Sequence, residues 1–485
     1  MWWEKAVVYQ VYPRSFQDSD GDGLGDLRGI ESRLDHLSWL GADALWLSPI
    51  YPSPLADFGY DISDYTGVDP VYGSMADFDS LVAAAHARGI RVLMDLVPSH
   101  TSIEHPWFRD HPEWYIWSPV DEPPNNWIAT FGGPAWSRDP FGRGWYLHSF
   151  YPEQPDLNWR VPAVRSAMAD VVRFWLDRGV DGFRVDAIDR LLKDASLRDD
   201  PVAEVPFGLP LGEEFATLSH VHSTNSPEIQ AAIAVVRRAA GDAYLVGEVY
   251  LPSSEALAYL SNFDQVFAFE LFHAAPSASA VSEALTAALG LVKGERSGAA
   301  WVLSNHDFPR LPARFGGELV RVAAMLLLTL PGSAFVYQGD EIGMSDGPGA
   351  HPPFDRAGRD GARHPMQWTP DPETGGFSSG TPWLAPVDPL ARSVEAQRED
   401  PGSLLSLYRA LIGLRGTLGR GMSLIDADDD VVAYTRGDEH VVALNLGAEP
   451  RRAPSHGEVL LATDAGAEAG GDTLPPHSGF VARRA

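Results

Sequence analysis

Charged and polar residues follow several short apolar stretches of this sequence, where each stretch would end as a β-strand. They are Asp95, His100, Arg184, Asp186, Glu248, His306 and Asp307. In GFRVDAIDR, Arg184 and Asp186 stand two residues apart, so a strand places both side chains on one face. Burying a cation and a carboxylate in an apolar interior is costly, which indicates a functional site. Neighbouring carboxylates and imidazoles transfer protons, so the pattern predicts acid–base chemistry.

The elements that must position these residues alternate regularly along the chain. Strand-like runs occur at residues 7–12, 44–49, 91–96, 182–187, 244–249, 265–271, 301–307 and 333–339. Between them lie helical patterns with apolar residues three and four apart. This order predicts an α/β protein, a (β/α)8 TIM barrel with right-handed crossovers. Because active sites of this fold lie at the carboxyl ends of the strands, we expect the polar residues to converge there.

Two further regions depart from the alternation. The connection between the third and fourth strands is too long for a βα loop and is rich in Trp, Pro, Gly and Asn. Short alternating strands with turn residues follow the last helices. We therefore expect a barrel at residues 1–100 and 161–405, an inserted subdomain at 101–160, and a C-terminal all-β sandwich domain at 406–485.

Composition excludes several classes of partner. The formal net charge of −29 repels nucleic acid and anionic membranes. The chain has no cysteine, which excludes disulfides and thiolate metal sites. No export signal is visible, and Pro331 and Gly332 interrupt the longest apolar stretch before it could span a bilayer. We expect a cytoplasmic protein with neither nucleic-acid nor membrane partners.

Several ordered motifs point to one family. DLVPSH, GFRVDAI, GEVY and SNHD resemble the conserved segments of the α-amylase superfamily of glycoside hydrolases (family 13). QPDLNW (154–159) is similar to the segment that marks its oligo-1,6-glucosidase and α-glucosidase branch. The resemblance implies a retaining, exo-acting α-glucosidase that releases terminal glucose through a covalent glucosyl-enzyme. It also implies a small α-glucoside or oligosaccharide substrate, no organic cofactor, and a monomer or weak homodimer.

The resemblance assigns the catalytic residues by position. Asp186 matches the nucleophile, Glu248 the general acid and base, and Asp307 the third carboxylate, which binds sugar hydroxyls. A retaining glycosidase needs its two reacting carboxylates roughly 5 Å apart. We expect Arg184 to orient Asp186 and keep it ionised, because a nearby cation lowers a carboxyl pKa.

Further positions match residues that bind the sugar. In ADFGYD, Asp57 and Tyr60 correspond to residues that cap the non-reducing end, which implies removal of one terminal glucose. The other predicted substrate-binding residues are His100, Phe131, Phe150, Arg184, His306 and Arg359. A zinc site at the two histidines is a remote alternative, because neither has a ligand at the spacing of a helical zinc motif.

An acidic, glycine-rich loop near the N-terminus suggests a metal. DSDGDGLGD offers carboxylates at Asp18, Asp20, Asp22 and Asp26, and hard oxygen ligands of this kind suit Ca²⁺. The loop resembles the family's single calcium site, with the Leu24 carbonyl as a further ligand. The ion would be structural. The alternative is an acidic surface turn.

Three other functions compete. A transglucosylase or isomerase, or an oligo-1,6-glucosidase, would use the same scaffold. A catalytically inactive binding subunit would lack a carboxylate and carry a membrane segment, and neither feature is seen. In this branch, relatives that favour α-1,6 linkages tend to have Val after the nucleophile, whereas Ala187 predicts a preference for α-1,4 linkages such as maltose. Alternatively, Ala187 is only a well-packed strand end.

Overall fold

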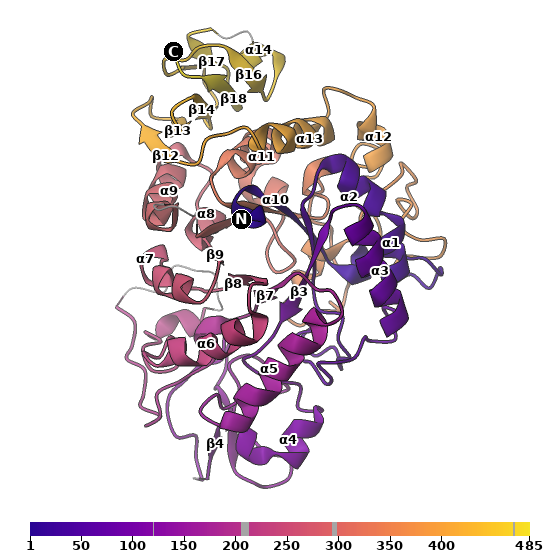
Figure 1. The fold of residues 1–485 in the computed structure, drawn as a ribbon, viewed down its shortest axis with the longest axis vertical. Helices are drawn as coiled ribbons and strands as arrows, with labels where there is room; N and C mark the ends of the chain where they lie inside the picture. Colours follow the sequence, from indigo (N-terminus) through magenta and orange to yellow (C-terminus); the bar gives the residue numbers. More distant parts are fainter. Residues whose placement is uncertain (120, 205–212, 293–297, 469–470) are drawn as a thin grey trace.

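Eight parallel strands close into a barrel at the centre of the protein (Figure 1). The computed structural model describes residues 1–119, 121–204, 213–292, 298–468 and 471–485. The barrel strands are β1 (Val7–Val11), β2 (Ala44–Leu47), β3 (Arg91–Leu96), β7 (Gly182–Val185), β8 (Tyr244–Gly247), β9 (Gln265–Phe267), β10 (Ala299–Val302) and β11 (Ser333–Tyr337). They neighbour one another in chain order, and β1 pairs with both β2 and β11. The predicted (β/α)8 barrel is therefore confirmed.

Most of the predicted strands end one or two residues earlier in the structure, and two differ by more. The run at 265–271 is β9 followed by the helix α8 (Phe269–His273), and the run at 301–307 is replaced by β10, which ends at Val302. Phe269 and Leu303 are nevertheless buried, because the chain stays in the interior after the strands end. An apolar run thus reports burial here rather than the length of a strand.

Helices cover the outside of the barrel. Besides α8 they are α1 (Leu27–Ser32), α2 (Leu34–Leu40), α3 (Met75–Ala87), α5 (Pro162–Leu176), α6 (Ile229–Ala240), α7 (Ser253–Ala256), α9 (Ala278–Val292), α10 (Leu311–Phe315), α11 (Val320–Thr329), α12 (Val394–Arg398) and α13 (Leu404–Arg415). In α5, Val164, Met168, Val172 and Trp175 recur at helical spacing and are buried. None of the helices in the described ranges is long and apolar enough to cross a membrane.

The connection from β3 to α5 forms a small unit of its own. It contains α4 (Pro106–Asp110) and a three-stranded sheet in the order β4 (Trp117–Ser118), β6 (Trp145–Leu147), β5 (Trp136–Arg138). Aromatic rings fill it, with Phe108 against Tyr115, Trp117 and Tyr146. The residues expected as an insertion at 101–160 therefore have their own sheet and aromatic packing.

A five-stranded sheet, β12-β13-β14-β18-β16, and a two-stranded sheet, β15-β17, lie at the C-terminal end (Figure 1). Their bounds are β12 (Met422–Ile425), β13 (Val431–Arg436), β14 (His440–Asn445), β15 (Arg451–Arg452), β16 (Val459–Ala462), β17 (Thr473–Leu474) and β18 (Ser478–Arg483), with α14 (Ala465–Glu468) between β16 and β17. The expected boundary before residue 406 falls inside α13, so the β domain begins later, at Met422. Leu405, Tyr408 and Leu411 explain the difference, because they are buried in the same core as the barrel.

Arg415 fixes the end of α13 to the barrel. Its guanidinium is buried and donates to four backbone carbonyls, those of Lys5, Leu328, Leu330 and Gly332. Burial lowers the pKa of Arg415 to about 9. Because Lys5 and Gly332 precede β1 and β11, these carbonyls lie at the amino ends of the strands. The helix α13 is therefore part of the barrel unit.

Candidate active site

A cavity of about 410 Å³ lies at the carboxyl ends of the barrel strands. Most of the residues predicted as catalytic or substrate-binding line it, namely Asp57, Tyr60, His100, Phe131, Phe150, Asp186, Glu248, Asp307 and Arg359. The other two, Arg184 and His306, are buried behind this lining and contact it. The structure therefore brings the predicted residues together, with two of them supporting the wall rather than forming it.

Arg184 links three carboxylates from neighbouring strands. Its Nη1 donates to Asp95 Oδ1 at 2.6 Å and to Asp186 Oδ1 at 2.5 Å. Its Nη2 lies 2.5 Å from Glu248 Oε1. Asp95 stands opposite Arg184 in the pairing of β3 with β7, while Asp186 and Glu248 directly follow β7 and β8. The barrel register thus gathers the three carboxylates around one guanidinium.

Burial opposes the effect of this shared cation on the pKa of the carboxylates. Burial raises the pKa of Asp186 well above its usual value; Arg184 opposes that shift, and Glu248 and Asp95 add to it. Burial likewise raises the pKa of Asp95 to about 6 against the effect of Arg184. Arg184 therefore lowers the pKa of Asp186 in the predicted direction, but burial and the two neighbouring carboxylates outweigh its effect. The cluster retains a proton to higher pH than a simple ion pair.

The chain turns sharply directly after Asp186. Ala187 has φ 42° and ψ 46°, a left-handed conformation that is uncommon outside glycine. The predicted strand therefore ends at Val185, before this turn. The Ala187 N–H donates to Glu248 Oε2 at 3.0 Å, and the Ile188 N–H donates to the Glu248 carbonyl at 3.2 Å. The turn holds the Glu248 carboxylate beside Asp186.

One wall of the cavity is closed by an arginine between two carboxylates. Arg359 Nη2 donates to Asp57 Oδ1 at 2.5 Å, and Nη1 donates to Asp307 Oδ1 at 2.9 Å. Its Nε donates to Asp355 Oδ2 at 2.9 Å, and this third contact fixes the orientation of the guanidinium. Burial by itself would raise the pKa of Asp307, but the permanently charged Arg359 and Arg363 hold it below its usual range. Asp307 is therefore ionised.

The two predicted histidines are neutral in this environment. His306 lies with Nε2 2.8 Å from the Tyr60 hydroxyl, and its ring stacks on Tyr60 at 5.5 Å. Burial lowers the pKa of His306 to about 3 and also lowers that of His100. The buried Gln154 amide joins the second histidine to the closed wall, because its Nε2 lies 3.0 Å from both His100 Nε2 and Asp57 Oδ2.

Sequence reasoning did not assign several residues of the site. Gln154 belongs to the QPDLNW motif, and Asp95 lies at the end of a strand, so the sequence could have indicated both as residues of the site. Other unassigned lining residues are Thr130, Tyr151, Asp189, Arg190, Tyr250, Phe308 and Arg356. Most of these lie on loops, whose positions no motif in the sequence fixes. Phe131 stacks on Tyr151 at 4.5 Å, which places an aromatic pair at the rim.

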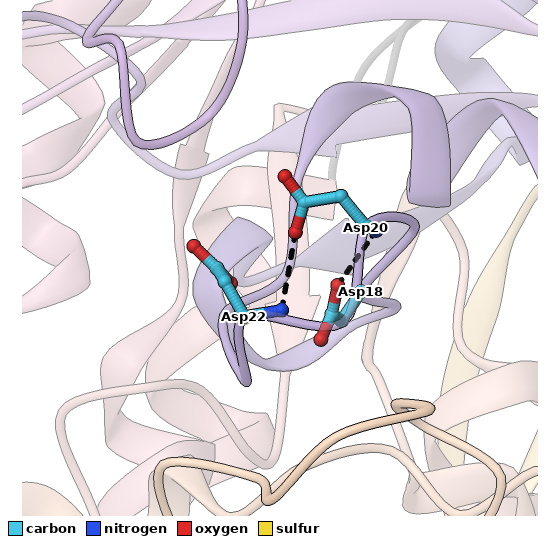
Figure 2. A group of neighbouring side chains, drawn as sticks. All are labelled: Asp18, Asp20 and Asp22. Carbon is cyan, nitrogen blue, oxygen red and sulfur yellow. Dashed lines mark hydrogen bonds between the residues drawn. The ribbon is translucent and has the colours of Figure 1, made fainter.

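The acidic loop after β1 gathers a second group of carboxylates (Figure 2). Ligand oxygens of Asp18, Asp20 and Asp22 lie within 4.8 Å of one another. The Asp20 N–H donates to Asp18 and the Asp22 N–H donates to Asp20, as Figure 2 shows. The three side chains thus offer clustered hard oxygen ligands, which fit Ca²⁺.

Asp26 and the Leu24 carbonyl, the other two predicted ligands, stay predictions. Asp26 caps α1, because its two oxygens accept from the backbone N–H groups of Gly29 and Ser19 at 2.7 Å each. The Leu24 N–H donates to Asp22 Oδ1 at 2.8 Å. The helix cap accounts for an acidic residue at position 26 without a metal.

A closed (β/α)8 barrel with carboxylates gathered at the carboxyl ends of its strands has the arrangement of a TIM-barrel enzyme, whose active site lies at that face. Residues 10–420 match the alpha amylase catalytic domain, and residues 419–481 match a domain of unknown function (DUF3459). The chain belongs to the α-amylase family of glycoside hydrolases.

Relatives and solved structures agree with this assignment. The chain is 39% identical to "Probable alpha-glucosidase" of Rhizobium meliloti, over 91% of this chain and 89% of that protein. It is 36% identical to "Oligo-1,6-glucosidase" of Parageobacillus thermoglucosidasius, over 94% and 92%. The crystal structure of an alpha-glucosyl transfer enzyme superposes with a TM-score of 0.91 at 36% identity, covering 100% of this chain and 99% of that one. Isomaltulose synthase from Klebsiella sp. LX3 gives 0.89 at 30% identity, covering 100% and 99%.

Proposed function

We propose that the protein is a retaining, exo-acting α-glucosidase that releases terminal glucose from small α-glucosides. The observation that carries the proposal is the position of Asp186 and Glu248 on one guanidinium, in a cavity whose opposite wall is closed by Arg359 and Asp57. Two adjacent carboxylates suit the double-displacement reaction of retaining glycosidases. A closed wall suits recognition of a chain end.

The reaction follows from these positions. Asp186 attacks the anomeric carbon of the terminal glucose while Glu248 gives its proton to the glycosidic oxygen, and the leaving sugar departs as an alcohol. Glu248 then takes a proton from water, which attacks the same carbon and releases Asp186. This step requires the proton to reside on Glu248 and Asp186 to be ionised, and the contact with Arg184 favours the charged form of Asp186. Ionised Asp307, held by Arg359, accepts hydrogen bonds from the sugar hydroxyls.

The test is to incubate the pure protein with maltose, isomaltose, sucrose and trehalose, and to follow the first anomer by NMR. We expect α-glucose to appear first and maltose to be cleaved. First release of β-glucose would overturn the retaining mechanism. Release of maltose from the interior of a longer maltooligosaccharide would overturn the exo mode.

Transglucosylation is the second candidate, because solved structures named for glucosyl transfer and isomerisation share the fold over nearly the whole chain. The same glucosyl-enzyme would pass its glucose to a sugar hydroxyl instead of water. Chromatography of reactions at rising maltose concentration separates the two outcomes. Each transfer to maltose releases one glucose for every trisaccharide, whereas each hydrolysis releases two glucoses and no trisaccharide. A molar ratio of trisaccharide to glucose that approaches one would therefore favour transfer.

Linkage preference is proposed from Ala187. We expect kcat/KM for maltose to exceed that for isomaltose, and Ala187→Val to move the preference towards isomaltose by about 10 to 200-fold at most. The left-handed backbone at Ala187 adds a condition, because a β-branched residue is strained there. Ala187→Ser is the matched control without β-branching. Preference of the wild type for isomaltose, or no shift in the valine variant, would contradict the proposal.

A structural Ca²⁺ at Asp18, Asp20 and Asp22 is a further proposal, supported by their clustered oxygens. The ion would neutralise the loop and would take no part in the reaction. The cytoplasmic location and the monomeric or weakly dimeric state remain predictions.

A further inference from the structure

Arg190 is a cation in the cavity whose guanidinium has no hydrogen-bond acceptor among the described residues. It lines the cavity and is largely buried, with 5% of its surface exposed. Within the described ranges its ionic contact is Asp189 Oδ2, 3.4 Å from Nε. Its guanidinium lies over the ring of Phe215, with 4.7 Å between the carbon and the ring centroid. The group is thus held in place, while its donors remain free.

The free donors are open to the cavity rather than sealed in the core. Elsewhere in the described chain, guanidinium nitrogens such as Nε of Arg184 are closed off from solvent without a partner, whereas those of Arg190 are not. Asp189 behaves differently, because its Oδ1 is buried without a partner. Asp189 therefore compensates the positive charge of Arg190, while the N–H groups of the planar guanidinium are available to a ligand in the cavity.

The position of Arg190 identifies the part of the ligand it would meet. Arg190 belongs to the short helical turn Ile188–Arg190, which begins after Ala187. The backbone of Ala187 and Ile188 is bonded to Glu248, the proposed proton donor to the leaving oxygen. The closed wall around Asp57 is built instead by Arg359 and Gln154. Arg190 thus follows the turn that holds Glu248 and lines the same cavity, outside the hydrogen-bonded wall around Asp57. This places its guanidinium on the side of the cavity where we expect the leaving group.

We propose that Arg190 is a specificity-determining residue that binds the hydroxyl oxygens of the leaving sugar, and of the acceptor sugar in transfer. The proposal rests on the α-glucosidase function proposed above. It predicts a preference for leaving groups that carry hydroxyls close to the cleaved bond. An aryl leaving group offers no such oxygens, so its cleavage does not use Arg190.

The test compares Arg190→Met with the wild type on maltose and on p-nitrophenyl α-glucoside. Loss of a charge-assisted hydrogen bond should lower kcat/KM for maltose by about 10 to 100-fold, mainly through KM, and leave the aryl substrate within about threefold. The share of trisaccharide formed from maltose should also fall, because the acceptor binds at the same place. Arg190→Lys keeps the charge without the fork and should give an intermediate ratio of the two substrates.

Controls separate this role from a structural one. Arg398→Met removes an arginine that also lies over an aromatic ring, that of Trp39, outside the cavity, and should leave the substrate ratio unchanged. Equal losses on both substrates in the methionine and lysine variants, or no loss on maltose, would overturn the proposal while the proposed function stands. If the wild type cleaves neither substrate, the proposed function fails and this inference fails with it.

Discussion

Two groups of three carboxylates in this protein differ in the groups that compensate their negative charges. Asp95, Asp186 and Glu248 lie in the barrel interior around the cation of Arg184. Asp18, Asp20 and Asp22 lie on a loop with no arginine or lysine paired to them among the described residues, and backbone N–H groups serve as their donors. The first group is buried, whereas Asp20 and Asp22 of the second are exposed.

The difference separates a reactive arrangement from a structural one. In the barrel group, burial and mutual repulsion raise the pKa of Asp186 and Asp95. In the loop group, burial would raise the pKa of Asp18, but Ser378 and the N–H groups of Gly21 and Gly23 lower it. Buried carboxylates that share few donors have raised pKa values and can act in proton transfer. Carboxylates with many donors have lowered pKa values, stay ionised and can bind a cation.

The largest expected effect is on turnover. Asp186→Ala or Glu248→Gln should reduce kcat by about 10³-fold or more, because each removes half of the two-carboxylate mechanism. The melting temperature should not fall, since each change also relieves repulsion around Arg184. Steady-state kinetics and a thermal melt of the same preparation measure both. More than a tenth of wild-type activity in either variant would refute the role assigned to that residue.

Removal of the shared cation tests the barrel group as a unit. Arg184→Met should lower the free energy of unfolding by about 3 to 5 kcal/mol, because it leaves buried carboxylates without their cation. Urea denaturation measures the change. Arg173→Met, at an exposed arginine paired with Asp170, is the matched control and should have little effect. Equal stability of the two variants would show that the barrel carboxylates do not depend on Arg184.

The two groups should also respond to pH with opposite sign. Asp95 has a folded-state pKa of about 6, above its unfolded value, so the free energy of unfolding should fall as pH rises from about 4 to 6. Asp95→Asn should remove this loss, which amounts to about 3 kcal/mol at two pKa units. The lowered pKa of Asp18 contributes stability that is fully present above the unfolded pKa and is lost as pH falls through the folded-state pKa, below about 4. Asp18→Asn should therefore destabilise the protein equally from pH 4 to 7 and less at lower pH. Thermal melts of both variants from pH 2 to 7 measure this, and equal pH dependence of the two variants would contradict the comparison.

Metal removal gives the smallest effect and concerns the loop group alone. A bound Ca²⁺ stabilises the native state by mass action, by roughly 1.4 kcal/mol when the free ion is about ten times Kd. Exhaustive chelation should therefore lower the melting temperature more than it lowers activity at moderate temperature. Asp20→Asn keeps an oxygen for the Asp22 N–H but loses the charge, and should abolish the response. Glu395→Gln, at an exposed acid elsewhere, should keep it. An unchanged wild-type melting temperature, with metal analysis confirming removal, would count against the site.

The barrel and the candidate catalytic carboxylates could be predicted because both depend on local patterns. Each strand is a short apolar run, and Asp186 and Glu248 directly follow such runs. In a parallel barrel, strand order alone brings those ends together. The predicted residues Asp57, Tyr60 and Arg359 also lie in one cavity, although their segments are far apart in the chain.

What could not be predicted depends on how many groups meet in space. The sequence shows Arg184 two residues from Asp186, but the contacts with Asp95 and Glu248 arise only from the strand register. Burial, assisted by these carboxylates, outweighs the cation and sets the direction of the Asp186 pKa. The loop residues Arg190 and Tyr151 have no periodic pattern that fixes their position. Asp26 caps α1, and because a helix cap and a metal ligand require the same residue type, its place among the calcium ligands stays a prediction.

The buried contacts of Arg415 set a limit on how this chain can be shortened or divided. A truncation at residue 405 would remove α13 and leave the carbonyls of Leu328, Leu330 and Gly332 without the donor that satisfies them. A cut after Leu418 keeps that anchor and removes only the terminal sheets, although it exposes the surface of α11 that β14 and β18 cover. Fusions and domain exchanges within this architecture should therefore place their junction between Leu418 and Met422, where the helix has ended and the sheet has not yet begun.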